Sequence, residues 1–484
     1  MLTIDNYIAQ LLDVIDEDSS VTDVKVEGNV KSVTITKNLK HDLLCPICGS
    51  KLYSKGRFTK HPKNQILQDG YTLKLTVIGR RWTCSNNECS YSCYDSFNFV
   101  EPRKQITKII PIRIIMELKD INLSCTQVAQ RFHVSDSYVH QIFMKYVSLK
   151  RKPLTEYICI DEVYLNISND CKYALVIMDF VTGDVLDIVQ SRRQSYTERY
   201  FLSIPREERN RVRYICCDMY DPYINYTTRY FSNAIAITDS FHVLQWLLRL
   251  IRNYINTVKK RYQERDRKIL ATKNYQTNQD NKTIQDSPEV YILKNAQWVL
   301  LMNPVNWTYH EPRYNHKLGK VMDTYEWENE FLKLDDNFIS IRNLKDLYES
   351  FNNEFANDLD GAQKKLDELI EIYSSSDISI FRDFAKLLTK YHQSIVNSFI
   401  CVKTQKNGSK NEMLRRLSNG PMESFNNIPS ALRRQSHGIS NFEFARNRIL
   451  WAIRDDAPIN IVPLSDSKIH KTGKKRGPYK KNNV

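Results

Sequence analysis

The apolar stretch Tyr157–Leu165, Y-I-C-I-D-E-V-Y-L, is rich in β-branched and aromatic residues and predicts a buried strand. Asp161 lies in the middle of it, where a carboxylate is costly unless a group such as a metal ion neutralises its charge. Two more apolar runs, Cys171–Phe180 and Val185–Gln190, are separated by a turn at Thr182-Gly183-Asp184 and predict two further strands. Together the three strands indicate an antiparallel meander.

Helical and strand patterns alternate after the meander. The predicted order is a helix over 196–203, a strand over 212–217, a helix over 222–231, a strand over 233–238 and a long helix from Phe241. Asp218 follows the first of these strands and Asp239 the second. Three antiparallel strands followed by α-β-α-β-α is the order of the RNase H-like fold, in which the first and fourth strands lie side by side. This order predicts that Asp161 and Asp218 are neighbours.

A helical region separates this α/β pattern from the last folded segment. Residues 259–287 are polar with little periodicity, and 293–400 carry aromatic and leucine spacing, so we interpret 259–410 as an all-α insertion into the catalytic domain. The final segment begins S-N-G-P-M-E-S-F-N-N at Ser418. Its Glu423 is a third carboxylate that could reach Asp161 and Asp218 from a helix packed on the sheet.

The N-terminal 40 residues show two patterns. An apolar stripe at helical spacing runs from Ile4 to Ile15, and an alternating stretch, Val24–Ile35, predicts a hairpin arm. We expect both to pack against the module that follows.

Two cysteine pairs stand in the next module. Five of the 11 cysteines fall between Cys45 and Cys93, and four of these lie within C-P-I-C-G-S and R-R-W-T-C-S-N-N-E-C. Paired cysteines in tight turns suit tetrahedral Zn²⁺, which thiolates bind without a large core. The predicted zinc ligands are Cys45, Cys48, Cys84 and Cys89, with Cys93 as a possible substitute. The alternative is that these are ordinary buried cysteines.

A helix-turn-helix pattern follows over 103–150. Ile106, Ile109, Ile110 and Ile114 form one apolar face. Ser124 and Ser135 can cap two further helices. The residues expected near the outer surface of the third helix, and hence to contact DNA, are Ser137, Tyr138, His140, Gln141 and Lys145. A three-helix connector without DNA contact is the alternative reading.

The charge balance favours a polyanionic partner. The chain has 484 residues and a formal charge of +14, from 70 Lys and Arg against 56 Asp and Glu. The tail over 466–484 is basic and predicts disorder, and Lys474, Lys475 and Arg476 are predicted to contact DNA phosphates unless the tail only solubilises the chain. No apolar run is long enough to span a bilayer, and the N-terminus has no secretory signal pattern, so we expect a cytoplasmic protein.

The motifs together resemble the ISL-three family of bacterial insertion-sequence transposases. The resemblance rests on the two cysteine motifs, the helix-turn-helix, I-D-E-V-Y, C-C-D-M-Y, T-D-S-F-H-V and S-N-G-P-M-E-S-F-N-N, which occur in the family's order over nearly the whole chain. By this resemblance, Asp161, Asp218 and Glu423 match a DDE triad that holds two Mg²⁺ or Mn²⁺ ions. Asp239 and His242 match a signature at the edge of the active site, although Asp239 could instead simply cap the following helix.

The resemblance departs from the family pattern after Glu423. Ser424 stands where the family usually has Gly, and Pro429 lies inside the expected helix, which it would kink or shorten. Arg433 and Arg434, farther along, are predicted to contact DNA.

The implied protein is a DNA transposase of mixed α/β class. It would have an RNase H-like catalytic domain interrupted by the all-α insertion and preceded by a zinc ribbon and a helix-turn-helix domain. The predicted segments are 1–40, the ribbon 41–100, the helix-turn-helix 103–150, the catalytic core 154–258 and 411–458, the insertion 259–410 and the tail 466–484. Its partner would be double-stranded DNA, bound by a homodimer or higher oligomer at the bacterial nucleoid. The alternative is a DNA-binding regulator, or a derivative that binds element ends without cutting them.

Overall fold

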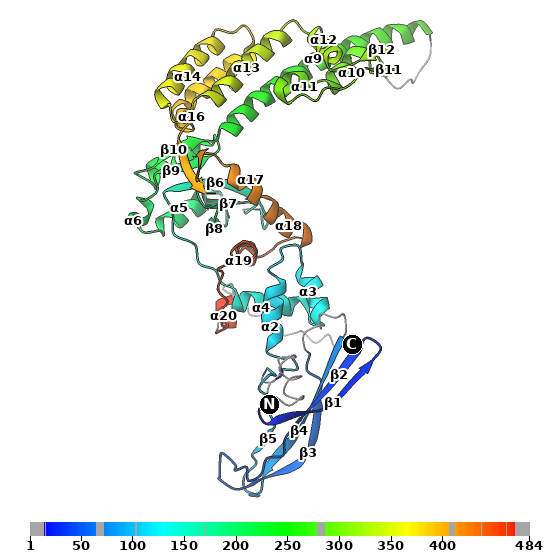
Figure 1. Cartoon of the computed structure of the whole chain (residues 1–484), viewed down its shortest axis with the longest axis vertical. Coiled ribbons are helices and arrows are strands. Elements are labelled where there is room, and N and C mark those ends of the chain that lie inside the picture. Colours follow the sequence, from blue (N-terminus) through cyan, green and yellow to red (C-terminus); the bar gives the residue numbers. More distant parts are fainter. Residues whose placement is uncertain are drawn as a thin grey trace, which may run out of the picture. The chain divides into compact units, whose positions relative to one another are not determined.

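Figure 1 shows the computed structural model of the chain. It describes residues 14, 16–63, 72–101, 104–169, 171–277, 286–405, 412–436, 438–460 and 462–469. The chain divides into two compact units. The first comprises Met1–Lys150, Tyr164–Lys172 and Asn427–Val484, and the second comprises Arg151–Val163 and Tyr173–Asn426. The predicted segment 411–458 is therefore shared between the two units.

The N-terminal part of the first unit is a five-stranded sheet with the order β1-β2-β4-β3 and β5 paired to β4. Its strands are β1 (Ser19–Glu27), β2 (Val30–Lys37), β3 (Leu52–Lys60), β4 (Thr72–Cys84) and β5 (Ser92–Tyr94). β1 and β2 form the predicted hairpin, and β2 pairs in parallel with β4. Residues 19–37 thus share one sheet with the cysteine motifs, as expected for packing against that module. The predicted helix from Ile4 to Ile15 lies outside the described residues, apart from Val14.

Three helices of the first unit lie in the segment for which a helix-turn-helix was predicted. They are α2 (Ile109–Glu117), α3 (Cys125–Phe132) and α4 (Asp136–Tyr146). The Ser124 hydroxyl accepts the backbone N–H of Gln127, and the Ser135 hydroxyl accepts that of Tyr138, so both predicted caps are present.

Helix α19 (Phe442–Ile453) packs on these helices although about 300 residues separate it from α4 in sequence. Arg448 is 1% exposed and donates hydrogen bonds to the backbone carbonyls of Leu118, Asp120 and Leu123, which end α2 and lead into α3. The indole of Trp451 donates to the Ile115 carbonyl at 3.0 Å. The charged guanidinium of Arg448 thus donates to carbonyls at the end of α2 that have no intrahelical N–H partner.

Replacing Arg448 with Met should loosen the junction between α2 and α3. Three carbonyls would lose their donor, and we expect the free energy of local opening to fall by about 3 kcal/mol. Hydrogen exchange of peptides covering 115–130 measures this directly. Arg267→Met, at an exposed position of the second unit, is the control and should leave that exchange unchanged. Unaltered exchange in Arg448→Met would show that α19 does not support the helix-turn-helix.

The second unit contains a five-stranded sheet with the order β10-β9-β6-β7-β8. Its strands are β6 (Tyr157–Tyr164), β7 (Tyr173–Asp179), β8 (Val185–Val189), β9 (Tyr214–Cys217) and β10 (Ile235–Thr238). β7 and β8 are antiparallel, whereas β9 is parallel to both β6 and β10. The connecting helices are α5 (Gln194–Leu202), α6 (Arg206–Arg209), α7 (Asp221–Ile224) and α8 (Tyr226–Arg229). The single helix predicted over 222–231 is in fact two short ones.

The helical region is longer than predicted and is not purely helical. α9 runs without interruption over Ser240–Thr277, so the predicted boundary at residue 259 was wrong. It is followed by α10 (Pro288–Asn295), α11 (Trp298–Leu301), η1 (Pro304–Asn306), α12 (Thr324–Leu332), α13 (Phe338–Glu354), α14 (Leu359–Ser374), α15 (Ser379–Lys390) and α16 (His392–Asn397). Two hairpins, β11 (Arg313–Asn315) with β12 (Lys320–Met322) and β13 (Cys401–Gln405) with β14 (Glu412–Arg416), correct the expectation of an all-α insertion.

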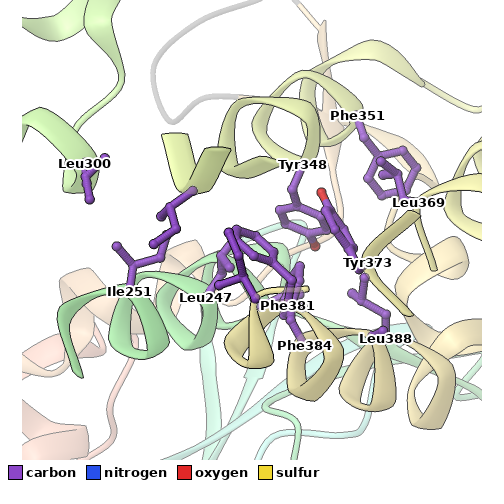
Figure 2. Close-up of a cluster of buried hydrophobic side chains, with 14 of the residues drawn as sticks. Leu247, Ile251, Leu300, Tyr348, Phe351, Leu369, Tyr373, Phe381, Phe384 and Leu388 are labelled. Carbon is purple, nitrogen blue, oxygen red and sulfur yellow. The ribbon is translucent and has the colours of Figure 1, made fainter. Parts of the chain in front are cut away.

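Aromatic and leucine side chains hold these helices together. Figure 2 shows Leu247 and Ile251 on α9 beside the rings of Phe381 and Phe384 on α15. Tyr348 of α13 meets Phe384 edge-on, with ring centroids 5.0 Å apart. The apolar stripe of α9 therefore explains why its N-terminal half packs as a helix: it buries Val243, Leu247, Ile251, Ile255 and Val258.

Candidate active site and metal-binding cluster

Asp161 and Asp218 stand on neighbouring strands of the second unit. Cys159 of β6 is the register partner of Cys216 of β9, and each Asp follows two residues later. Because the strands are parallel, equal steps from a paired position keep the two residues at the same level of the sheet. The predicted proximity of the two carboxylates is confirmed.

The electrostatics of Asp161 reflect this proximity. Burial, followed by repulsion from the Asp218 carboxylate, raises the pKa of Asp161 to about 6. The backbone N–H of Glu162 and the side chain of Asn426 oppose the shift by hydrogen bonding to the charged form. A cation between the carboxylates would remove the repulsion, so the donor chemistry fits a divalent ion with hard oxygen ligands.

His242 and Asp239 complete a cluster of ionisable groups around the end of β9. His242 Nε2 lies 2.8 Å from Asp218 Oδ1 and 3.9 Å from Asp239 Oδ2. Burial opposes protonation of His242, but the bond to Asp218 and the surrounding negative charges outweigh it and raise the pKa of the imidazole. Asp239 is 2% exposed, and its Oδ1 accepts the backbone N–H of Phe241 at 3.2 Å. Asp239 therefore does cap α9, whereas His242 contacts an acid of the site directly.

The segment that carries Glu423 packs beside β6. The Asn419 side chain donates to the Ile160 carbonyl at 3.3 Å, and the Cys159 thiol donates to the Ser418 carbonyl at 3.4 Å. Helix α17 (Gly420–Phe425) begins directly after these contacts. Glu423 is exposed in its first turn, and Asn426, one turn later, bonds to Asp161. Residues three apart share a helix face, so α17 presents this face toward the Asp161 end of β6.

The helix after Glu423 is interrupted, as Pro429 led us to expect. α17 ends at Phe425, and α18 (Asn427–Gln435) starts a new helix with Pro429 in its first turn. Pro is tolerated there because the first-turn N–H groups lack intrahelical acceptors. The break between the two helices thus lies N-terminal to the proline, at Asn426.

A cavity of about 830 Å³ opens beside Asp161 and Asp218 in the second unit. The first half of α9 contributes one wall and the end of α15 another. Its lining combines the two acids and His242 with Arg, Lys and aromatic side chains. Glu423 is not among the lining residues.

The four predicted zinc ligands lie together in the first unit. Their Sγ atoms all fall within 4.8 Å of one another, with Cys45 and Cys89 at 3.8 Å and Cys48 and Cys84 at 3.4 Å. A tetrahedral ion with Zn–S bonds of about 2.3 Å needs sulfurs about 3.8 Å apart, so the cluster could bind zinc. Cys93, in β5, is not part of it.

The protonation of the four thiols is coupled to the binding of an ion. Hydrogen bonds from Ser50 lower the pKa of Cys48 to about 6, whereas burial raises the pKa of Cys84 to about 12. Four thiolates so close together would repel one another without a cation, and a bound divalent ion would deprotonate all four.

Comparison with known families draws these observations together. A family model described as a transposase, that of the ISL-three family, matches residues 158–449, more than half of the chain. The chain belongs to the ISL-three family of transposases. No curated protein shows significant similarity to it.

The residues of α4 that were predicted to bind DNA in this transposase differ in their exposure. Ser137 and Gln141 of α4 are exposed, but the ring of His140 stacks on Phe444 of α19 with centroids 4.3 Å apart. Tyr138 is half-buried, and Lys145 accepts the backbone N–H of Leu464 on its carbonyl. The expected outer position is thus wrong for His140, because α19, which is distant in sequence, covers that side of α4.

Other predicted contacts fall near the C-terminus of the transposase. Arg434 of α18 is exposed, while the guanidinium of Arg433 lies over the ring of Tyr164 at 4.8 Å. Residues Asp466–Ile469 form a helical turn, α20, so the predicted disorder of the tail is wrong for these four residues. Lys474, Lys475 and Arg476 lie outside the described residues. Among the helices that the structure describes, none is long and apolar enough to cross a membrane.

Several residues of the transposase site were not found from the sequence. Asn419 and Asn426 flank Glu423 within the S-N-G-P-M-E-S-F-N-N motif, and both contact the β6 region. Trp246 and Arg249 follow His242 by four and seven residues, a spacing that puts them on one face of α9. That spacing was visible in the sequence once α9 was recognised as a helix.

Proposed function

We propose that the chain is a DDE-type DNA transposase that binds the ends of its insertion sequence and catalyses metal-dependent DNA strand cleavage and transfer. The observation that carries the proposal is the pair Asp161 and Asp218 at the same level of adjacent parallel strands, with the Glu423 helix packed beside β6. The strand order β10-β9-β6-β7-β8 supports an RNase H-like arrangement of this unit.

Asp161, Asp218 and Glu423 would hold the catalytic ions. Their carboxylate oxygens suit Mg²⁺ or Mn²⁺, and the raised pKa of Asp161 indicates a site crowded with negative charge. Once bound, two such ions would supply Lewis acidity toward the scissile phosphate and activate the attacking oxygen. Asn426 holds the Asp161 carboxylate through its side chain, and His242 holds Asp218, so both acids are oriented before DNA arrives.

The reaction has two chemically similar stages. Water attacks phosphorus at the element end and the bond to the 3′ oxygen breaks, which frees a 3′-OH and leaves a 5′-phosphate on the flanking strand. That 3′-OH then attacks a phosphodiester of target DNA and displaces a target 3′-OH. Each stage exchanges one P–O bond for another, so no redox partner is required.

DNA recognition falls to the first unit in this proposal. Its cysteine-cluster turns and the exposed Ser137 and Gln141 of α4 would contact the element ends, and the charge of +14 would supply phosphate affinity. Two ends must be held together during transposition, which favours a homodimer or higher oligomer on DNA.

One observation favours the second candidate, an end-binding derivative that does not cut. Glu423 is exposed, and the cavity beside Asp161 and Asp218 does not include it. A cleavage assay separates the candidates: the protein is incubated with duplex DNA containing the ends of the element, with Mg²⁺, Mn²⁺ or Ca²⁺. We expect strand-specific nicks at the ends with Mg²⁺ or Mn²⁺ and binding alone with Ca²⁺. Binding without nicks under all three conditions would support the derivative.

His242 tests whether the contact with Asp218 serves catalysis. His242→Ala should lower the cleavage rate by roughly 10- to 100-fold, as expected for a group that orients a metal ligand. The thermal midpoint should change little, because the Asp239 cap on α9 remains. Asp239→Ala should instead lower the thermal midpoint. If His242→Ala lost stability and activity in parallel, the imidazole would be structural.

A further inference from the structure

Three of the aromatic side chains that line the cavity beside the paired acids have an arginine over the ring. The guanidinium of Arg249 lies 4.1 Å from the ring centroid of Trp246. That of Arg192 lies 4.8 Å from Tyr173 and 5.9 Å from Tyr220. All five residues line the cavity. Arginine planes and aromatic rings are the surfaces on which proteins stack unpaired bases.

The positions of these side chains are fixed by their neighbours. Glu162, next to Asp161 on β6, accepts Arg192 at 2.5 Å and the hydroxyl of Tyr223 at 2.6 Å. Arg192 is therefore held between Tyr173 and Tyr220, which are 39% and 43% exposed. The ring of Tyr220 is thus accessible to a ligand at the edge of the catalytic carboxylates.

The α9 wall of the cavity carries further cationic and aromatic side chains. His242, Trp246 and Arg249 lie along one face of α9, at steps of four and three residues, and Arg252 follows three residues later. Arg249 and Arg252 have no acidic partner in the described part of the chain. The indole N–H of Trp246 is buried and finds no acceptor there either. Two free guanidinium groups and an unused donor suit a ligand that brings phosphate and carbonyl oxygens.

We propose that this cavity binds an unpaired nucleotide of the DNA substrate, next to the phosphodiester that is cut. The placement of this nucleotide next to the cleaved bond rests on the proposed cleavage function. The capacity of the cavity to bind an unpaired nucleotide does not. The base stacks on Tyr220 and on the Arg249–Trp246 pair of α9, and Arg252 meets the adjacent phosphate. A volume of about 830 Å³ admits a nucleotide, since pockets for small ligands span roughly 300–1,000 Å³.

An intact duplex fits this site less well than an unstacked strand. A duplex presents its phosphates on the outside and keeps its base faces inside the stack. The aromatic rings of the cavity therefore cannot stack on its bases and add no binding free energy. A nucleotide rotated out of the duplex uses the rings and the arginines together. The cavity would then hold the DNA strand open at the cleavage position.

The test measures single-strand binding separately from cleavage. Wild type, Trp246→Ala and Arg249→Ala are titrated, with Ca²⁺ in place of Mg²⁺, against a fluorescein-labelled oligothymidine and against a duplex of equal length. We expect both variants to lose roughly five- to a hundredfold in affinity for the single strand, the effect of removing one stacking group. Duplex affinity should change less than twofold. Arg267→Ala is the matched control because it removes the same charge from an exposed site on α9, 18 residues and about 27 Å farther along.

A second arm places the nucleotide at the cleavage position. End-containing duplexes carry 2-aminopurine at each position around the cut, and its fluorescence rises when the base leaves the stack. Wild type should raise the signal at one flanking position and Trp246→Ala should not, while Trp246→Phe should restore it in part.

The outcomes separate this inference from the proposed function. If the wild-type protein binds single strands but never cuts DNA, the proposed cleavage function is wrong and the nucleotide-binding site is still supported. Equal losses on single strand and duplex would overturn the inference and make the cavity a general DNA groove. Unchanged single-strand affinity in both variants would overturn it as well.

Discussion

Asp161→Asn and Asp218→Asn should each reduce DNA cleavage by roughly a thousandfold or more. Changes in groups that merely orient metal ligands cost about 10- to 100-fold, and loss of a ligand carboxylate should cost more. Asn keeps the shape of the side chain and removes its charge. Nicking of end-containing duplex with Mg²⁺ or Mn²⁺ measures the effect, and end binding should survive.

Asp161→Asn should not destabilise the protein. At neutral pH the folded state keeps Asp161 charged despite burial and the repulsion of Asp218, and both effects raise its pKa above the unfolded value. This deprotonation therefore works against folding once the pH exceeds the unfolded pKa. Without metal, Asp161→Asn should melt at the same temperature as wild type or higher. A large drop in the melting temperature would mean that the lost cleavage reflects unfolding.

Glu423→Gln gives the sharper test of the third acid, because the structure leaves its side chain exposed. Loss of cleavage comparable to Asp218→Asn would place Glu423 in the active site. Glu412→Gln, at an exposed position on β14, is the matched control and should cut like wild type. A substantially active Glu423→Gln protein would refute its assignment and favour another group, with Asn426 the first to examine.

The pair of neighbouring acids could be predicted because Asp161 interrupts one apolar strand pattern and Asp218 directly follows another. A carboxylate inside Tyr157–Leu165 has no structural reason to be there, and the strand order then brings Asp218 to its side. The two caps at Ser124 and Ser135 and the cysteine cluster were equally local signals. Residues a few positions apart in a turn or at a helix end have a defined relative geometry, so such motifs can be recognised before the fold is known.

Contacts between distant segments could not be predicted in this way. Arg448 looks like one basic residue of an exposed helix, yet it is buried under the carbonyls that end α2. The polar second half of α9 has few apolar residues, but the helix continues from its packed N-terminal half to Thr277. In both cases the deciding contact is with a partner far away in sequence, and no local pattern records it.

Loss of zinc is the second change for which we expect a large effect, here on the stability of the cysteine turns. About one Zn²⁺ per chain should copurify, and Cys48→Ser should lose it, because three remaining thiolates do not close a structural site. Structural zinc contributes about 10–16 kcal/mol of binding free energy in small peptides, far more than the turns around Cys45 and Cys89 can supply alone.

The damage should stay local, since the sheet has a core of its own. Val33, Ile35, Leu75 and Val77 are buried away from the cysteine turns. Hydrogen exchange should therefore accelerate over 43–52 and 84–92 and remain slow in β2. Cys93→Ser is the matched control, because it removes a nearby thiol outside the cluster and should keep both the metal and slow exchange. If the ribbon serves to read element ends, specific end binding should fall with the metal. Metal-free protein with full end affinity and unchanged exchange would show that these four thiols pack together without a structural ion.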